Sequence, residues 1–169
     1  MLVLVTGPAG AGKSSLARPL AKALGLPLIE KDVVKEALAV VLPPADVPES
    51  RRLGAASYEV MYALSLHAPN VVLESNFPPE AVPRLLELCS SPVEIFCKCP
   101  PEEVMRRYEA RIGKRGMLHF DSERTEELRT SLDQENRPLA LGGPLLEVDT
   151  TRPVDVPAVA AWVANTLAT

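Results

Sequence analysis

Apolar residues recur along this chain in two alternating patterns. Short, mostly apolar runs bounded by Gly, Pro or polar residues are typical of buried strands, and longer segments with apolar residues three or four apart are typical of amphipathic helices. The short runs predict strands at 2–5, 27–31, 71–73, 93–99 and 145–148. The longer segments predict helices at 14–24, 32–42, 51–67, 79–89, 101–114, 122–136 and 156–167.

Glycine, proline and polar residues mark the ends of these segments. Gly25 closes the first helix, Asp32 is placed to cap the second, and Pro101 opens the fifth. Residues 45–50 and 116–121 fit neither pattern, so we expect them to be irregular. Because the chain has 17 prolines against 9 glycines, its connecting loops should be stiff.

Strands that alternate with long helices predict an α/β fold, a three-layer sandwich in which one five-stranded parallel sheet has helices on both faces. Ligands of such sheets bind at the carboxyl ends of the strands. Polar or special residues follow nearly every predicted strand, at Gly7, Lys31–Asp32, Glu74–Asn76, Cys99–Pro100 and Asp149–Thr151. We therefore expect a binding site along that edge of the sheet.

The first of these strand ends has the sequence G-x-x-x-x-G-K-S, from Gly7 to Ser14. With a strand before it and a helix after it, this is the phosphate-binding loop, or Walker A motif, and a chance glycine-rich turn would lack that context. Its N–H groups would surround phosphate oxygens, Lys13 would reach the β- and γ-phosphates, and the Ser14 hydroxyl would bind Mg²⁺. The expected nucleotide-binding residues of the loop are Gly7, Pro8, Ala9, Gly10, Ala11, Gly12, Lys13, Ser14 and Ser15.

The overall composition is that of an ordinary globular domain. The chain has 169 residues, of which 47% are hydrophobic and 24% charged. A net charge of −4 and a pI of about 5.3 argue against non-specific binding to nucleic acid or to an anionic membrane. No apolar run approaches a membrane span, and Leu2–Val5 lacks the basic lead-in of a signal peptide. We therefore expect a cytoplasmic protein without membrane contact.

The three cysteines, Cys89, Cys97 and Cys99, are expected to be free thiols. Cys97 and Cys99 are two residues apart in a predicted strand and so face the same side of the sheet. Because the two histidines, His67 and His119, lie elsewhere in the sequence, we do not expect a zinc site.

Asp32 and Lys35 follow the second predicted strand. A carboxylate at this strand end would face the γ-phosphate across the cleft and could accept the proton of an incoming hydroxyl group. Lys35 lies about one helical turn later, shares the face of Asp32, and is a candidate for holding an anionic group of the substrate. The alternative is that Asp32 only caps the helix, although capping and catalysis are compatible roles.

Arg107, Arg111 and Arg115 recur every four residues and so line one side of a helix. Glu103 is spaced to pair with Arg107, whereas Arg111 and Arg115 have no acidic residue at helical spacing. Their mutual repulsion would be reversed by a polyphosphate. We therefore interpret residues 106–121 as a short helical lid whose arginines close over the nucleotide, with a solvated cationic face as the alternative.

The remaining candidates lie near the third strand or beyond the lid arginines. Glu74 ends this strand, where its carboxylate would either hold Mg²⁺ through water or be structural. Asn76 and Tyr62 are assigned to an acceptor pocket that we expect to be built mainly from residues 32–68. For His119, substrate contact and simple packing are both open interpretations.

The chain resembles the P-loop small-molecule kinases of the adenylate-kinase-like group. The segments that carry this resemblance are Gly7–Ser14, Lys31-Asp32-x-x-Lys35 and Arg107-x-x-x-Arg111. Within that group the chain is most similar to chloramphenicol-phosphotransferase-like and polynucleotide-kinase-like proteins. The resemblance spans nearly the whole chain and extends, less specifically, to Glu74 and Val148–Thr151. It implies a P-loop NTPase fold with strand order 2-3-1-4-5.

The same resemblance implies roles for individual residues. Asp32 would be the general base, and Arg111 and Arg115 would be lid residues. Arg107 and the loop Asp149–Pro153, with Thr150, would hold the adenine. Polynucleotide-kinase-like members often carry arginine at the position of Lys35, and a lysine cannot clamp a phosphate through two parallel hydrogen bonds.

Taken together, these features predict a single P-loop kinase domain over residues 1–169. We expect it to transfer the γ-phosphate of Mg·ATP to a hydroxyl group of a small molecule, a metabolite or an antibiotic-like alcohol. Two alternatives are a polynucleotide 5′-hydroxyl kinase and a non-catalytic nucleotide-binding switch. The acidic pI and the 4% aromatic content disfavour a nucleic-acid partner.

Overall fold

The central strand β1 (Leu2–Thr6) is buried on both faces of the sheet. The computed structural model describes residues 1–68, 70–114 and 117–167, without the side chains of 117 and 167. Leu2 and Leu4 pack into one apolar cluster, and Val3 and Val5 pack into another on the opposite face. A strand with apolar residues at every position therefore connects two cores, as is typical of a parallel sheet covered by helices on both sides.

Four further strands complete a parallel sheet with the order β2-β3-β1-β4-β5, which confirms the predicted order. These strands are β2 (Leu28–Glu30), β3 (Val71–Glu74), β4 (Val93–Lys98) and β5 (Leu145–Asp149). Val5 pairs with Glu74, so the end of β1 lies beside the end of β3. This register places the phosphate loop next to the carboxylate of Glu74.

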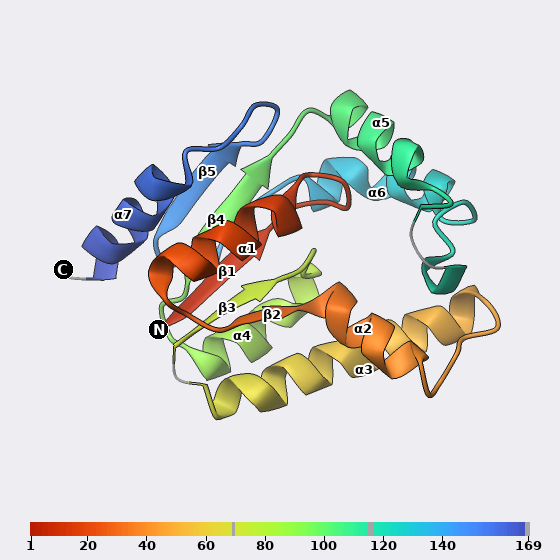
Figure 1. Ribbon diagram of the computed structural model, residues 1–169, viewed down its shortest axis with the longest axis horizontal. Coiled ribbons are helices and arrows are strands. Elements are labelled where there is room, and N and C mark those ends of the chain that lie inside the picture. The colour runs from red at the N-terminus through yellow and green to blue at the C-terminus, as the bar shows by residue number, and fades with distance from the viewer. Residues whose placement is uncertain (69, 115–116, 168–169) are drawn as a thin grey trace.

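Helices cover both faces of the sheet, as the sequence predicts (Figure 1). Helices α1 (Lys13–Leu24) and α7 (Val156–Leu167) pack against the face formed by Val3 and Val5. Helices α3 (Val47–Leu66) and α4 (Val82–Leu88) pack against the opposite face. The two layers hold the sheet rigidly from both sides.

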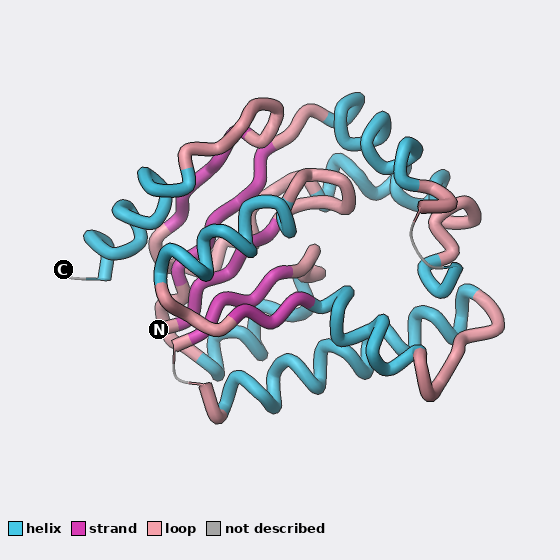
Figure 2. The backbone as a smooth tube through the Cα atoms, viewed as in Figure 1, coloured by secondary structure: helices cyan, strands magenta, loops and turns pink. Residues whose placement is uncertain are grey.

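Two groups of helices extend beyond the carboxyl edge of the sheet and face each other (Figure 2). One group is α2 (Lys31–Ala39), which packs along the first half of α3. The other is α5 (Pro101–Arg111), the short turn η2 (Met117–His119) and α6 (Thr125–Glu135). Among the described residues, no helix is both long enough and apolar enough to cross a membrane.

Several helix boundaries differ from the prediction. The N-cap of α2 is Glu30, so Asp32 lies inside the first turn and does not cap the helix. Asp46 caps α3 by accepting a hydrogen bond from the Glu49 N–H at 2.8 Å, and the expected loop 45–50 is therefore partly helical. The predicted helix 79–89 is divided into the turn η1 (Pro79–Ala81) and α4.

We expect the buried leucine of α4 to matter far more to stability than an exposed leucine of α3. Leu85 is fully buried under the sheet, whereas Leu66 is 64% exposed. Leu85→Ala should lower the free energy of unfolding by about 2–5 kcal/mol because it leaves a cavity. The matched control Leu66→Ala should change it by less than about 0.5 kcal/mol. Urea denaturation measures both values, and equal losses would contradict the assigned core.

Candidate active site

A cavity of about 470 Å³ lies along the carboxyl edge of the sheet, where the polar residues after the strands predict a site. Its wall combines segments that are far apart in the chain: the phosphate loop, the start of α2, the residues after β3, the end of α5, and α6. The site candidates that line it are Ala9, Gly10, Gly12, Lys13, Ser14, Ser15, Asp32, Lys35, Glu74, Asn76, Arg107, Arg111 and His119. Fold and cavity thus bring most of the predicted residues together.

The backbone of the phosphate loop depends on glycine at Gly10. This residue has a φ of 95°, and a Cβ added there would lie 2.9 Å from the carbonyl oxygen of Val104 in α5. Any side chain would therefore clash with backbone. The remaining loop residues, Gly7, Pro8 and Ala11, lie behind the cavity wall, and the Pro8 carbonyl accepts a hydrogen bond from the Lys13 ammonium at 2.9 Å.

Lys13, Ser14 and Glu74 form a compact polar group between β1 and β3. Lys13 Nζ lies 4.0 Å from Glu74 Oε1, and the Ser14 hydroxyl donates to Glu74 Oε2 at 3.4 Å. Burial lowers the pKa of the Lys13 ammonium, and the charge of Glu74 partly opposes this shift. Burial likewise raises the pKa of the Glu74 carboxyl group, against the opposing charge of Lys13. Each charge is thus held in the low-dielectric cleft largely by the other.

A hydroxyl and a carboxylate at this position suit Mg²⁺, which prefers oxygen ligands and retains several waters. Among the described residues, no group of three or more His, Cys, Asp or Glu side chains is arranged to hold a metal ion. Ser14 and Glu74 supply two oxygen donors, so they fit a Mg²⁺ that would take its remaining ligands from water and nucleotide phosphates.

Asp32 lies across the cavity from the phosphate loop, in the first turn of α2. Its side chain is 43% exposed, and its Oδ1 lies 3.1 Å from the Lys31 ammonium. The carboxylate is thus accessible from the cavity and is held by a neighbouring cation. The short strand β2, which ends at Glu30, brings Asp32 to the sheet edge.

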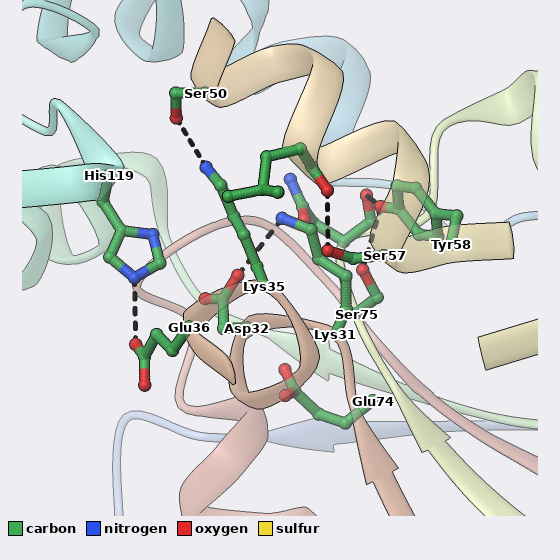
Figure 3. Close-up of polar contacts among 12 residues, drawn as sticks. Lys31, Asp32, Lys35, Glu36, Ser50, Ser57, Tyr58, Glu74, Ser75 and His119 are labelled. Carbon is green, nitrogen blue, oxygen red and sulfur yellow. Dashed lines mark hydrogen bonds and ion pairs between the residues drawn. The ribbon is translucent and has the colours of Figure 1, made fainter. Parts of the chain in front are cut away.

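Lys35 and His119 both line the cavity and are almost fully buried. The Lys35 ammonium donates to the Ser50 hydroxyl at 2.6 Å, and His119 Nε2 lies 2.9 Å from Glu36 Oε1 (Figure 3). Because His119 both lines the cavity and packs against α2, the structure is compatible with either interpretation of this residue.

Arg111 ends α5 and points along the cavity wall. Its guanidinium lies 4.6 Å from the centre of the Tyr108 ring, and its Nε lies 3.8 Å from Asp121 Oδ2. Asp121 is ten positions away in the chain, which is far outside the spacing of three or four residues at which side chains meet on one helix. Arg115, the other expected lid arginine, lies outside the described residues.

Arg107 and Thr150 lie together beside the phosphate loop. Arg107 donates to Glu103 Oε1 at 2.6 Å, which confirms the predicted pair, and to the Thr150 carbonyl at 3.0 Å. A Cβ added at Gly12 would lie 3.6 Å from Thr150 Cβ and 3.7 Å from Arg107 Nη1. Thr150 is not part of the cavity wall, although it supports Arg107 there.

Tyr62, which the sequence analysis assigns to the acceptor pocket, does not line this cavity. Tyr62 is 5% exposed and packs in the apolar cluster beneath the sheet, with its ring centre 6.1 Å from that of Tyr58. The helical rotation of α3 turns Tyr62 toward the core. Tyr58, one turn earlier, instead shares a 2.9 Å hydrogen bond with the Ser75 hydroxyl at the cavity wall.

Several cavity residues were given no role of their own from the sequence: Lys31, Ser75, Asp121, Arg124 and Glu127. Lys31 and Ser75 belong to the polar groups that follow predicted strands, so their positions already indicated this edge of the sheet. Asp121 is the last residue of the predicted lid, Arg124 and Glu127 follow it, and nothing in their spacing connects these three residues to the phosphate loop.

The clash at Gly10 gives a direct test of the loop. Gly10→Ala should lower the affinity for ATP by about tenfold or more, equivalent to about 1.4 kcal/mol, because the backbone must move to accept a Cβ. Gly25→Ala is the matched control, since Gly25 also has a positive φ (66°) but has no atom within 4 Å of an added Cβ. Isothermal titration calorimetry measures both affinities, and unchanged binding in Gly10→Ala would contradict the loop geometry.

Comparisons with known proteins agree with this fold and cavity. Residues 2–134 match the model of the family AAA_33, described as an AAA domain. A crystal structure from Chloroflexus aurantiacus J-10-fl, assigned as a kinase without a named substrate, is 32% identical with a TM-score of 0.86 and covers 98% of this chain and 97% of that chain. A search of curated protein sequences finds no match.

Two more distant structures share the fold. A shikimate kinase from Aquifex aeolicus has 19% identity and a TM-score of 0.65, over 99% of this chain and 96% of that chain. A gluconokinase from Sinorhizobium meliloti has 17% identity and a TM-score of 0.58, over 99% and 90%. The chain therefore belongs to the AAA_33 family of P-loop domains and has the fold of the P-loop kinases.

Proposed function

We propose that this protein transfers the γ-phosphate of ATP to a hydroxyl group of a small molecule. The observation that carries this proposal is the shared cavity, which has the phosphate loop on one side and Asp32 on the other. A nucleotide-binding site alone needs no exposed carboxylate opposite the γ-phosphate position. A phosphotransferase does, because the incoming hydroxyl must be oriented and must lose its proton.

On the donor side, the loop Gly7–Ser15 holds the phosphates, with Lys13 at the β- and γ-phosphates. Bound at Ser14 and Glu74, Mg²⁺ would neutralise phosphate charge. Arg111 and Arg115 stabilise the charge of the transferred group from the lid, and Arg107 with Thr150 contacts the adenine. Pre-positioned positive charge of this kind lowers the barrier without reorganisation during the reaction.

On the acceptor side, Asp32 orients the hydroxyl group and accepts its proton, while Lys35 and Asn76 contact the rest of the molecule. The cavity wall carries carboxylates, including Glu74, Asp121 and Glu135, beside its cations. This mixture differs from the basic, aromatic-lined groove that a nucleic-acid strand needs. It therefore favours a small acceptor, in the manner of the chloramphenicol-phosphotransferase-like group, over a polynucleotide 5′-hydroxyl.

Replacing the proposed base should abolish most of the transfer. Asp32→Asn keeps the size of the side chain but cannot accept the proton, so kcat should fall about 10²–10⁴-fold while ATP affinity is kept. The assay is ADP release over hydroxylated metabolites, antibiotics and short 5′-hydroxyl oligonucleotides. Asp46→Asn, at the cap of α3, is the matched control and should leave turnover unchanged. A non-catalytic switch would show no acceptor-dependent turnover in any variant.

The second test concerns Mg²⁺. Glu74→Gln keeps the oxygen that accepts from Ser14 but removes the negative charge, so half-maximal activity should need about 10–100-fold more Mg²⁺. Glu94→Gln is the matched control, because Glu94 is also a buried strand carboxylate but accepts from Thr6 and Leu139, outside the cavity. Titration of Mg²⁺ at saturating ATP measures the difference. If both variants need the same Mg²⁺ concentration for half-maximal activity, Glu74 has a structural role instead.

A further inference from the structure

Lys31 lies beside the proposed base, and its ammonium group contacts the carboxylate. Lys31 Nζ lies 3.1 Å from Asp32 Oδ1, and both residues line the cavity (Figure 3). Consecutive residues of a helix do not face each other, so the backbone of α2 does not by itself bring these two side chains together. The position of the lysine side chain therefore depends on its contacts with other elements.

Helix α3 provides the surface against which the Lys31 side chain lies. Lys31 Nζ lies 5.8 Å from the centre of the Tyr58 ring, within the range of a cation–π contact. One turn earlier on α3, a Cβ added at Gly54 would lie 4.0 Å from Lys31 Cε. A glycine inside a long helix costs about 0.5–1 kcal/mol relative to alanine, and here it leaves space beside the lysine stem. The Lys31 side chain is 15% exposed, against 43% for that of Asp32.

Tyr58 is in turn fixed by the residues that follow β3. Its hydroxyl shares a hydrogen bond of 2.9 Å with Ser75 Oγ and donates to the Asn76 carbonyl at 3.2 Å. Its ring packs against that of Phe77, with the ring centres 5.7 Å apart. Lys31 thus connects the start of α2 to a wall formed by α3 and the end of β3.

This arrangement affects the carboxylate more than it affects stability. A partly exposed ion pair contributes little to the free energy of unfolding. Pairing with a held ammonium, however, favours one rotamer of the Asp32 side chain, and the positive charge offsets repulsion from a γ-phosphate across the cavity. Because phosphoryl transfer depends mainly on positioning and electrostatics, a fixed and ionised carboxylate matters more here than a strongly basic one.

We propose that Lys31, held over the Tyr58 ring, is a positioning residue that orients the Asp32 carboxylate and keeps it ionised opposite the γ-phosphate. This inference rests on the proposed kinase function, since it concerns the base of that reaction. Lys31 acts through Asp32, and Tyr58 acts through Lys31, so neither residue has to contact the acceptor.

Other titratable groups also act on the Asp32 carboxylate, and they come from every element around it. Lys13, Glu74 and Tyr58 interact with it electrostatically. The further groups that line the same cavity include Lys35 of α2, Arg111 of α5 and His119 of η2. All of these groups are retained when the lysine before Asp32 is replaced. A difference in titration between that variant and the wild type therefore reports the lysine itself.

The first part of the experiment measures the Asp32 carboxyl group directly and needs no acceptor. Carbon-13 NMR of the aspartate carboxyl groups follows its titration, and its signal is assigned by its absence in Asp32→Asn. Loss of a cation 3.1 Å away makes protonation easier, so the midpoint in Lys31→Met should lie about one pH unit higher than in the wild type. Lys31→Arg keeps the charge and should leave the midpoint unchanged. Lys98→Met is the matched control, because Lys98 pairs with Glu147 at 2.7 Å but does not line the cavity.

The second part measures phosphate transfer to the hydroxyl compound that gives the fastest ADP release in the Asp32 screen. Lys31→Met should lower kcat about 10–100-fold, while the KM values for ATP and for the acceptor change by less than about threefold. The acid limb of the pH profile of kcat should also move upward by about one pH unit. Lys31→Arg should recover most of kcat, and Lys98→Met should leave it unchanged.

The third part separates the ring of Tyr58 from its hydroxyl group. Tyr58→Phe keeps the ring face under the ammonium, so kcat should stay within about twofold of the wild-type value. Tyr58→Leu removes the ring face, so kcat should fall about 3–5-fold, with the pH profile shifted in the same direction as in Lys31→Met. Tyr62→Leu is the matched control and should keep kcat, because Tyr62 stacks on Tyr58 in the same apolar cluster but does not line the cavity.

Three outcomes would overturn the inference. Lys31→Met leaves kcat as high as Lys98→Met does, whether or not the NMR midpoint moves; Lys31→Met raises only the KM for the acceptor, which would make Lys31 an acceptor contact; or Tyr58→Leu behaves like Tyr62→Leu. If no hydroxyl compound stimulates ADP release, or if Asp32→Asn keeps full activity, the proposed function itself fails. That failure is distinguishable, because the NMR titration tests the pairing of Lys31 with Asp32 without an acceptor. Circular dichroism of each variant separates a lost fold from a lost contact.

Discussion

The register of β1 between its two neighbours is the constraint on which the cavity depends. Val5 pairs with Glu74 on one side, and Thr6 pairs with Phe96 on the other. β1 ends one residue beyond its pairing with Glu74, whereas β4 continues to Lys98, so the phosphate loop leaves the sheet beside the Glu74 carboxylate and against the backbone of Cys97. A shift of one residue would reverse the faces of every side chain in β1 and separate Lys13 from Glu74.

Burying the ion pair of Lys13 and Glu74 costs desolvation free energy. Burial shifts the pKa of each group toward its neutral form, and the partner charge opposes this shift in both cases. Replacement by apolar residues would relieve the desolvation cost. In the proposed mechanism the same two charges meet nucleotide phosphates and Mg²⁺, so the unfavourable pair becomes an organised binding site when the nucleotide enters.

On the other side of the cavity, elements that are far apart in the chain together enclose the charge of Lys35. Lys35 is positioned by α3 and by the turn η2, through Ser50 and the Leu118 carbonyl. In the proposed mechanism, residues 117–119 would help to enclose the acceptor, and the exclusion of water would strengthen electrostatic contacts and limit hydrolysis of ATP.

The sequence by itself determined the strands, the parallel sheet and the residues of the phosphate loop, because these depend on local periodicity and on one specific motif, whereas the strand order came from the resemblance to P-loop kinases. It also indicated Asp32, Glu74 and Arg107, since each lies at a strand end or at helical spacing from a partner. Only the tertiary structure decided that Tyr62 faces the core, that Asp121 lies beside Arg111, and that Ser50 holds Lys35. These contacts join elements that are far apart in the chain. Their geometry depends on how each helix is rotated and packed, which a local sequence pattern does not specify.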